Sequence, residues 1–252
     1  MRTVTLNFGA PNKYFVDEAY KALRANIQFC GIDVKAIAIT SCHPNEGKST
    51  TAVEMAKSLA EAGKKVLLID ADLRKSEMIK KYVDSAGIFG LSQYLSGQNT
   101  LDEVLFATQI EGLHIVFSGQ FPANPVELLG SSAFGKMIEE QKQVYDYVLI
   151  DTPPLGVVID CAVVANVCDS AILVMAAEKV SYRSAVITKN QLEKSGVHIL
   201  GVVLNMVKMG KVRYPKYYGK AKKSKYSKYE AEDEVEEEIE AGAEAEFVPM
   251  GK

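Results

Sequence analysis

Apolar runs alternate with segments of helical spacing over most of the chain. Runs rich in Val, Ile and Leu predict strands at 36–41, 65–70, 113–117, 146–151, 169–175 and 198–204. Apolar residues that recur every three or four positions predict helices at 14–30, 48–62, 74–83, 100–107, 133–143, 158–166 and 181–195. Strands that are apolar at successive positions are typical of a parallel sheet covered on both faces. We therefore expect an α/β fold with a mostly parallel central sheet and helices on both faces.

The alternation ends after Asn205. Residues 208–229 are rich in Lys and Tyr and contain no acidic residue, whereas residues 230–252 contain ten acidic residues and one basic residue. Segments with so few apolar side chains cannot bury enough surface to fold alone. The sequence therefore predicts a folded domain over 1–207 and a flexible C-terminal tail over 208–252.

The composition fits one ordinary soluble domain. The chain has 252 residues, of which 48% are hydrophobic and 24% charged, so it can form a full core. The four cysteines show no CxxC spacing, so neither a zinc site nor a disulfide framework is indicated, and a reducing compartment is expected. The N-terminal residues lack the apolar core of a signal peptide, and no apolar run approaches the length of a membrane-spanning helix. We expect any membrane association to go through a partner or a surface.

The strand predicted at 36–41 opens into the loop CHPNEGKST, at 42–50. Backbone N–H groups of such a loop, with a helix N-terminus behind them, can bind phosphates. Gly47 permits close approach of backbone to phosphate, Lys48 supplies a cation for the outer phosphates, and Ser49 offers a hydroxyl to magnesium. Cys42 stands where the full GxxxxGK[ST] pattern has its first Gly, so an ordinary strand–turn–helix with an incidental Lys stays open. The candidate nucleotide ligands in the loop are Asn45, Glu46, Gly47, Lys48, Ser49 and Thr50.

Three carboxylates stand at the ends of two other predicted strands. Asp70 and Asp72 lie one residue apart at the end of one strand, and Asp151 ends the other. Ligands bind at the carboxyl ends of strands in open α/β sheets, and two close carboxylates repel unless a dication or Arg74 offsets them. Magnesium would do so, and the three strand ends together predict a site for a nucleoside triphosphate with Mg²⁺. The alternative is an acid cluster that interacts with a helix dipole.

Two further features lie at the end of the predicted domain and beyond it. Asn205 ends the last predicted strand, where it either reads the edge of a nucleotide base or structures a loop. Five of the 12 tyrosines cluster in the Lys-rich tail segment, although such segments usually lack aromatic residues. They either stack on some surface from a solvated tail or make the tail a substrate for the ATP site of this or a neighbouring chain. These tyrosines are Tyr214, Tyr217, Tyr218, Tyr226 and Tyr229.

Together these motifs resemble the bacterial tyrosine kinases (BY-kinases), of the type made as a separate cytoplasmic chain beside a membrane activator. ITSCHPNEGKST matches the family's Walker A motif, LLIDADLRK its Walker A′ motif and VLIDTPP its Walker B motif. The tyrosine cluster, NPVELL at 124–129 and EAYKALRANIQF at 18–29 also look like that family. The resemblance spans about residues 14–229 and implies a P-loop NTPase fold.

The resemblance implies ATP and Mg²⁺ as cofactors and a protein tyrosine kinase that autophosphorylates its tail in trans. It also implies a ring-like homo-oligomer, a transmembrane activator or chain-length regulator as partner, protein tyrosine substrates, and control of capsular or exopolysaccharide synthesis. The chain would then lie in the cytoplasm at the inner face of the membrane through that partner, and no nucleic-acid partner is expected.

The resemblance assigns roles to the catalytic residues. By the family pattern, Lys48 binds phosphates, and Ser49 and Asp72 lie at the magnesium. Asp151 supports the metal, and Asp70 is the candidate base for the incoming tyrosine hydroxyl.

The family's oligomer element, E-x-x-R-x-x-R, is present in altered form as Glu18, Lys21 and Arg24. Lys keeps the charge of the replaced Arg but loses its bidentate fork. Asn45 stands where the family commonly has Gly, and we expect the loop to keep its shape because Asn tolerates left-handed backbone angles.

Two rival functions share parts of this pattern. A partition or cell-division ATPase of the ParA/MinD group would have a second lysine near the start of the loop, where this chain has His43, and would lack the tyrosine cluster. In that case the basic tail would bind DNA or anionic lipid. The other rival is a catalytically idle, nucleotide-gated scaffold for a membrane partner.

Overall fold

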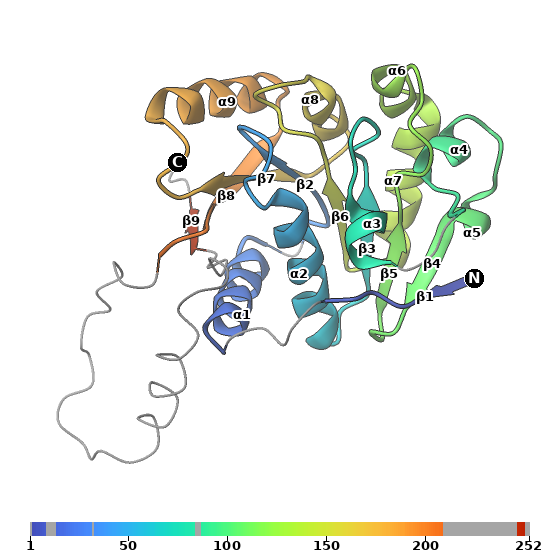
Figure 1. Ribbon diagram of the computed structural model, residues 1–252, viewed down its shortest axis with the longest axis horizontal. Coiled ribbons are helices and arrows are strands. Elements are labelled where there is room, and N and C mark those ends of the chain that lie inside the picture. The colour runs from blue at the N-terminus through green and yellow to red at the C-terminus, as the bar shows by residue number, and fades with distance from the viewer. Residues whose placement is uncertain (1, 9–13, 32, 84–86, 209–245, 250–252) are drawn as a thin grey trace, which may run out of the picture.

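The computed structural model describes residues 2–8, 14–31, 33–83, 87–208 and 246–249. Its strands form one nine-stranded sheet in the order β1-β4-β5-β3-β6-β2-β7-β8-β9 (Figure 1). Neighbouring strands run parallel except in the pairs β4–β5 and β8–β9. The strands are β1 (Arg2–Val4), β2 (Ala36–Ser41), β3 (Val66–Asp70), β4 (Leu105–Thr108), β5 (Leu113–Val116), β6 (Tyr147–Asp151), β7 (Ser170–Ala176), β8 (His198–Asn205) and β9 (Glu246–Pro249).

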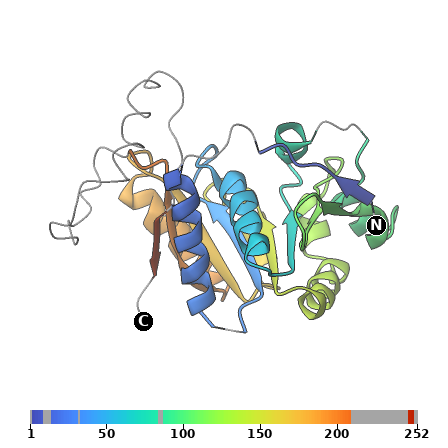
Figure 2. The same ribbon diagram turned by 90° about the horizontal axis from the view of Figure 1, so that it is seen from below.

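Helices pack on both faces of the sheet, as Figure 2 shows from below. The core has two layers: α1 to α3 contribute buried residues to one layer, and α4 to α9 contribute to the other. The helices are α1 (Tyr14–Phe29), α2 (Lys48–Glu61), α3 (Met78–Tyr82), α4 (Leu91–Leu95), α5 (Leu101–Val104), α6 (Pro125–Leu129), α7 (Ser132–Val144), α8 (Asp160–Ala165) and α9 (Tyr182–Lys194).

Strand β2 shows why the central strands are apolar throughout. Ile37 and Ile39 face the layer of α1 to α3, while Ala36 and Ala38 face the layer of α7 to α9, and all four are fully buried. Successive side chains of a strand point to opposite faces, so a strand covered on both sides needs apolar residues at every position. The predicted fold class, a mostly parallel sheet with helices on both faces, is confirmed.

Two predicted helices differ from the structure. The helix predicted at 100–107 is wrong beyond Val104, because residues 105–108 form β4, which pairs with both β1 and β5. The helix predicted at 74–83 begins only at Met78, because the preceding residues form a turn held by hydrogen bonds to aspartate side chains. The short elements β1, α4 and α6 were not predicted, since three to five residues carry too little periodicity to be read.

One part of the predicted flexible tail has regular structure. Glu246–Pro249 form β9, which pairs antiparallel with β8 and completes the edge of the sheet. These four residues differ from the predicted flexible tail, because their backbone pairs with β8 at an edge that would otherwise have unpaired backbone groups. Residues 209–245, with the five tail tyrosines, lie outside the described residues. No helix within the described part of the chain is long and apolar enough to span a membrane.

Candidate active site

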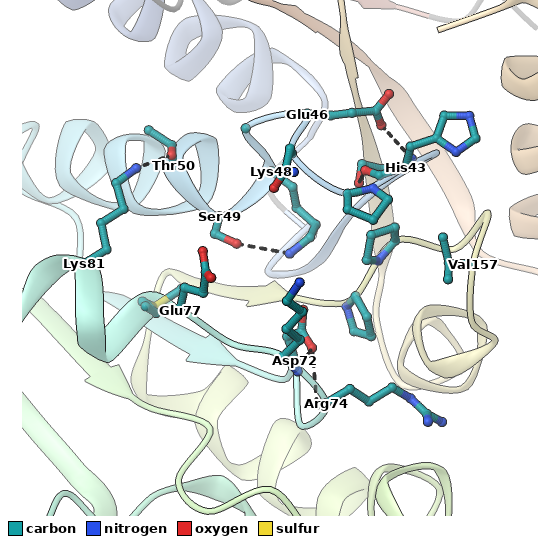
Figure 3. Close-up of a pocket in the computed structure, with 18 of the residues that line it drawn as sticks. His43, Glu46, Lys48, Ser49, Thr50, Asp72, Arg74, Glu77, Lys81 and Val157 are labelled. Atoms are coloured by element: carbon teal, nitrogen blue, oxygen red, sulfur yellow. Dashed lines mark hydrogen bonds between the residues drawn. The ribbon is translucent and has the colours of Figure 1, made fainter. Parts of the chain in front are cut away.

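A cavity of about 410 Å³ lies at the edge of the sheet where β2, β3 and β6 end (Figure 3). The phosphate loop, the turn that follows β3 and the prolines that follow β6 line it. These segments are far apart in sequence but adjacent in space, because β3, β6 and β2 are successive strands of the sheet and run in the same direction. The sequence prediction of one site at the three strand ends agrees with this arrangement.

The loop between β2 and α2 has the backbone of a phosphate-binding loop. Asn45 and Gly47 both have positive φ angles, of 63° and 80°, and Gly47 is the N-cap of α2. The N–H of Thr51 donates to the Gly47 carbonyl at 2.8 Å, so the helix begins directly at Lys48. The expectation that Asn45 tolerates a left-handed conformation is therefore consistent with the structure. The N-terminus of α2 points its backbone N–H groups at the place where phosphates would lie.

Asn205 lies behind this loop rather than at the cavity wall. Its Nδ2 donates to the Glu46 carbonyl at 2.9 Å, its Oδ1 accepts from the N–H of Met206, and the residue is only 1% exposed. A Cβ on Gly47 would overlap the Nδ2 of Asn205. These contacts favour the loop-structuring alternative for Asn205, which the sequence left open beside the base-reading one.

Lys48 lies at the centre of the site. Its Nζ contacts Asp151 Oδ1 at 2.9 Å and Ser49 Oγ at 3.1 Å, and the residue is 8% exposed. Burial opposes the charge of Lys48, but the carboxylates of Asp151 and Asp72 outweigh it, so the pKa of Lys48 is raised from its ordinary value. Lys48 is therefore held as a cation where the outer phosphates of a nucleotide would lie.

Asp70 and Asp151 are partners in register at the ends of β3 and β6, and both are buried. Burial and then the nearby charge of Asp151 raise the pKa of Asp70 to about 7. Burial also raises the pKa of Asp151, although the Lys48 ammonium opposes the shift. The hydroxyl of Ser76 donates to Asp70 Oδ2 and accepts from the N–H of Met78. Sequence reasoning missed Ser76, and its only signal was a Ser just before a helix.

Asp72 lines the cavity from the turn that follows β3. Its Oδ1 accepts the N–H groups of Arg74, at 3.3 Å, and Lys75, at 2.9 Å. No group of three or more His, Cys, Asp or Glu side chains in the described residues could hold a metal by itself. Mg²⁺ usually keeps waters and binds through one or two carboxylates together with substrate phosphates, so the donors present here fit it. Ser49, Asp72 and Asp151 are the residues whose hydroxyl and carboxylate oxygens could hold the ion.

Two more cavity residues were not predicted as site residues. Lys81 at the end of α3 donates from Nζ to Thr50 Oγ1 at 2.7 Å and so connects α3 to the phosphate loop (Figure 3). Val157, in the segment after β6, is 60% exposed at the opposite wall of the cavity. Neither residue belongs to a motif with a known spacing, and only the fold brings them to the cavity.

The candidate oligomer residues lie on α1, away from the cavity. Lys21 Nζ contacts Glu18 Oε1 at 2.7 Å, and both side chains are about half exposed, at 54% and 47%. Arg24 Nη1 donates to the backbone carbonyl of Ser58 at 2.8 Å and to its hydroxyl at 3.2 Å, and so joins α1 to α2 within the chain. Glu18 and Lys21 therefore lie on the surface, whereas Arg24 also connects two helices of the same chain.

The sequence of this chain matches known proteins over most of its length. A family model described as an AAA domain matches residues 34–198. The tyrosine-protein kinase CpsD of Streptococcus agalactiae is 44% identical over 206 residues, which cover 81% of this chain and 90% of CpsD. The chain belongs to the bacterial tyrosine kinase family. The resemblance drawn from the motifs is thereby confirmed.

Solved structures of the family share the fold. The kinase domain of the Escherichia coli tyrosine kinase ETK superimposes with a TM-score of 0.74 at 28% identity, covering 87% of this chain and 95% of that domain. The septum site-determining protein MinD of Pyrococcus horikoshii, solved with Mg-ADP, reaches a TM-score of 0.59 at 28% identity over 71% of this chain and 72% of MinD. The P-loop NTPase fold is shared by both, and the bacterial tyrosine kinase is the more similar structure.

Proposed function

We propose that this chain is an ATP-dependent protein tyrosine kinase, which transfers the γ-phosphoryl group of ATP to a protein tyrosine and releases ADP. The observation that carries the proposal is the site itself: a phosphate loop with Lys48 faces Asp70, Asp72 and Asp151 at one edge of the sheet. The 44% identity to a tyrosine-protein kinase supports the choice of tyrosine as acceptor.

The residues of the site divide the work of phosphoryl transfer. Lys48 and the backbone N–H groups around Gly47 bind and orient the phosphates, since phosphoryl transfer depends mainly on positioning and charge neutralisation. Ser49 and Asp72 would hold Mg²⁺, with Asp151 supporting it and orienting Lys48. Bound magnesium would supply neutralisation of the charge on the transferred phosphoryl group.

Asp70 is the proposed acceptor of the tyrosine hydroxyl proton. A base works best when its pKa lies near the working pH, and burial beside Asp151 raises the pKa of Asp70 to about 7. Ser76, which donates to Asp70 Oδ2, fixes the orientation of the carboxyl group. The tyrosine hydroxyl loses its proton to Asp70 as its oxygen bonds to the phosphorus and the bond to ADP breaks.

We further propose that the tail tyrosines are acceptors in trans within a homo-oligomer, that Glu18, Lys21 and Arg24 contribute to its contacts, and that a transmembrane activator brings the chain to the membrane. The support is membership of the bacterial tyrosine kinase family, as shown by the similarity to the tyrosine-protein kinase CpsD. On this basis the kinase regulates capsular or exopolysaccharide synthesis. The position of Glu18 and Lys21 on the exposed face of α1 agrees with such a contact.

The three candidate functions differ in their products. Purified chain is incubated with ATP and Mg²⁺, with and without the cytoplasmic segment of its membrane activator, and ADP and phosphotyrosine are measured together. A tyrosine kinase forms phosphotyrosine in the tail along with ADP. ADP without phosphotyrosine would indicate a MinD-like ATPase, and nucleotide binding without either product would indicate a scaffold.

A further inference from the structure

An ion pair joins the turn after β3 to the start of α8. Arg74, in the turn after β3, contacts Asp160 Oδ1 through its Nε at 2.8 Å, and Asp160 is the first residue of α8, after β6. The two residues are 86 positions apart in sequence. β3 and β6 are neighbouring parallel strands. The contact therefore ties the segment after β3, which carries Asp72, to the segment that follows Asp151 at the end of β6.

The burial of the two partners is very unequal. The Asp160 side chain is 0% exposed, whereas the Arg74 side chain is 40% exposed at the cavity wall. The second oxygen of Asp160, Oδ2, is buried without a hydrogen-bond partner among the described residues. A buried carboxylate with one oxygen unsatisfied is expensive, and it is poor evidence for a purely stabilising role. This cost points to a function for the contact besides stability.

The contact between Arg74 and Asp160 is linked to Asp72 through the backbone of the turn. The backbone N–H groups of Arg74 and Lys75 both donate to Asp72 Oδ1. No hydrogen bond in the described part of the chain goes to Asp72 Oδ2, so that oxygen is available to the cavity. Figure 3 shows the Arg74 side chain extending away from Lys48, while its backbone stays bonded to Asp72. Anchoring the guanidinium at Asp160 therefore fixes the turn that orients the Asp72 carboxylate.

We infer that Asp160 is a positioning residue for the metal site: through Arg74, it holds the turn at 72–75 so that Asp72 Oδ2 faces a Mg²⁺–nucleotide complex. The inference rests on the proposed function in so far as that function places magnesium at Asp72. Groups that orient a metal ligand typically change metal affinity by about 10- to 100-fold when removed. The pair is thus expected to act on magnesium binding through Asp72.

The test measures magnesium binding directly. Fluorescent ADP is titrated onto purified Asp160→Asn, Arg74→Ala and Arg74→Lys variants at increasing Mg²⁺, and the Mg²⁺ concentration for half-maximal binding is compared with that of the original protein. Asp160→Asn and Arg74→Ala are expected to raise this concentration by about tenfold. The variant with both Asp160→Asn and Arg74→Ala is expected to need the same Mg²⁺ concentration as either single variant, because each substitution removes the same contact. If Asp160→Asn does not fold, the Arg74 variants still test the contact, because the Arg74 side chain is exposed and its substitution is tolerated more easily.

A matched control separates positioning from loss of stability. Asp169 and Lys142 form an ion pair of similar length, 2.7 Å, but at the opposite edge of the sheet. Asp169→Asn is expected to lower the melting temperature without changing the half-maximal Mg²⁺ concentration. If the Arg74 and Asp160 variants behave like this control, with a lower melting temperature and an unchanged Mg²⁺ requirement, the positioning role is overturned.

Failure of the inference and failure of the proposed function give different results. Asp72→Asn is titrated alongside and is expected to raise the Mg²⁺ requirement at least as much as the Asp160 variant. An unchanged requirement in Asp72→Asn would overturn both the metal assignment and the positioning role. Because the readout is nucleotide binding, a chain that binds Mg²⁺ and ADP in the expected way but forms no phosphotyrosine would contradict the kinase proposal and still support the role of Asp160.

Discussion

At the scale of single residues, the phosphate loop depends on one position that only Gly can occupy. Gly47 has a φ of 80°, and a side chain there would overlap Asn205, which holds the loop through the Glu46 carbonyl. Gly63 provides a close comparison, because it has the same φ of 80° but nothing within 4 Å of an added Cβ. The two glycines therefore share the backbone strain but not the steric conflict.

We predict that Gly63→Ala lowers the free energy of unfolding by ~1–2 kcal/mol, the cost of a left-handed conformation for an L-residue, and that Gly47→Ala lowers it by more, because its side chain also overlaps Asn205. Only Gly47→Ala is expected to weaken nucleotide binding, by more than about tenfold, because the loop must move away from Asn205. Thermal unfolding and fluorescent ADP titration measure the two effects. Equal nucleotide affinity in the two variants would show that Asn205 does not constrain the loop.

At the scale of elements, the amino end of β2 is fixed by Asp169. Its Oδ2 accepts the N–H groups of Lys35 and Ala36, and its Oδ1 accepts from Lys142 Nζ of α7. Burial alone would raise the pKa of Asp169, but the bonds from Lys142, Ala36 and Lys35 outweigh it and lower the pKa below its ordinary value. A carboxyl group whose pKa is lowered by folding stabilises the folded state at pH values above its pKa in the unfolded chain. That contribution is lost as the pH falls through its pKa in the folded chain.

Asp169→Asn is therefore expected to cost about 1–3 kcal/mol of unfolding free energy at pH 7, the usual range for charge-assisted hydrogen bonds that are partly buried. The difference from the original protein should shrink as the pH falls below about 4, the unfolded pKa of Asp. Urea unfolding at several pH values measures it. A destabilisation that stays constant down to the acid unfolding transition would mean that the charge of Asp169 contributes nothing.

The elements also show what the sequence could and could not predict. The central strands were predicted closely, because burial on both faces forces apolar residues at every position, as in β2. The segment LFAT at 105–108 was predicted as helix, since its role as β4 depends on pairing with β1 and β5, which local spacing does not encode. In the site, Lys48 was predicted from the phosphate-loop motif, and Asp70, Asp72 and Asp151 were predicted from their positions at the ends of strands. Ser76 was not, because its contact with Asp70 exists only once the turn has folded.

At the scale of the whole molecule, the question is whether a chain modifies its own tail or that of a neighbour. The described residues before the tail tyrosines end at Lys208, shortly after Asn205, which ends β8 and bonds to the phosphate loop. A tail of this length could reach either site by distance alone. The family and the exposed pair Glu18 and Lys21 favour transfer between chains.

We predict that a Lys48→Met chain with an intact tail becomes phosphorylated when it is mixed with an active chain whose five tail tyrosines are replaced by Phe. The Phe-substituted chain retains the complete site and strand β9 but has no tail tyrosine of its own, so any tail phosphotyrosine must arise in trans. Mass spectrometry of the Lys48→Met chain detects it. If the tail of the Lys48→Met chain stays unmodified while the intact active chain modifies itself, transfer occurs within one chain.

Transfer of phosphate from ATP to tyrosine at the Lys48 site is tested by mapping phosphotyrosine in the full-length chain after incubation with ATP, Mg²⁺ and the activator segment. We predict phosphotyrosine in the tail of the original protein and of a Lys136→Met control, whose lysine is 77% exposed on α7. We predict none in Lys48→Met, in a chain that still folds, as a cooperative thermal unfolding transition would show. Equal tyrosine phosphorylation in a well-folded Lys48→Met chain would contradict this prediction.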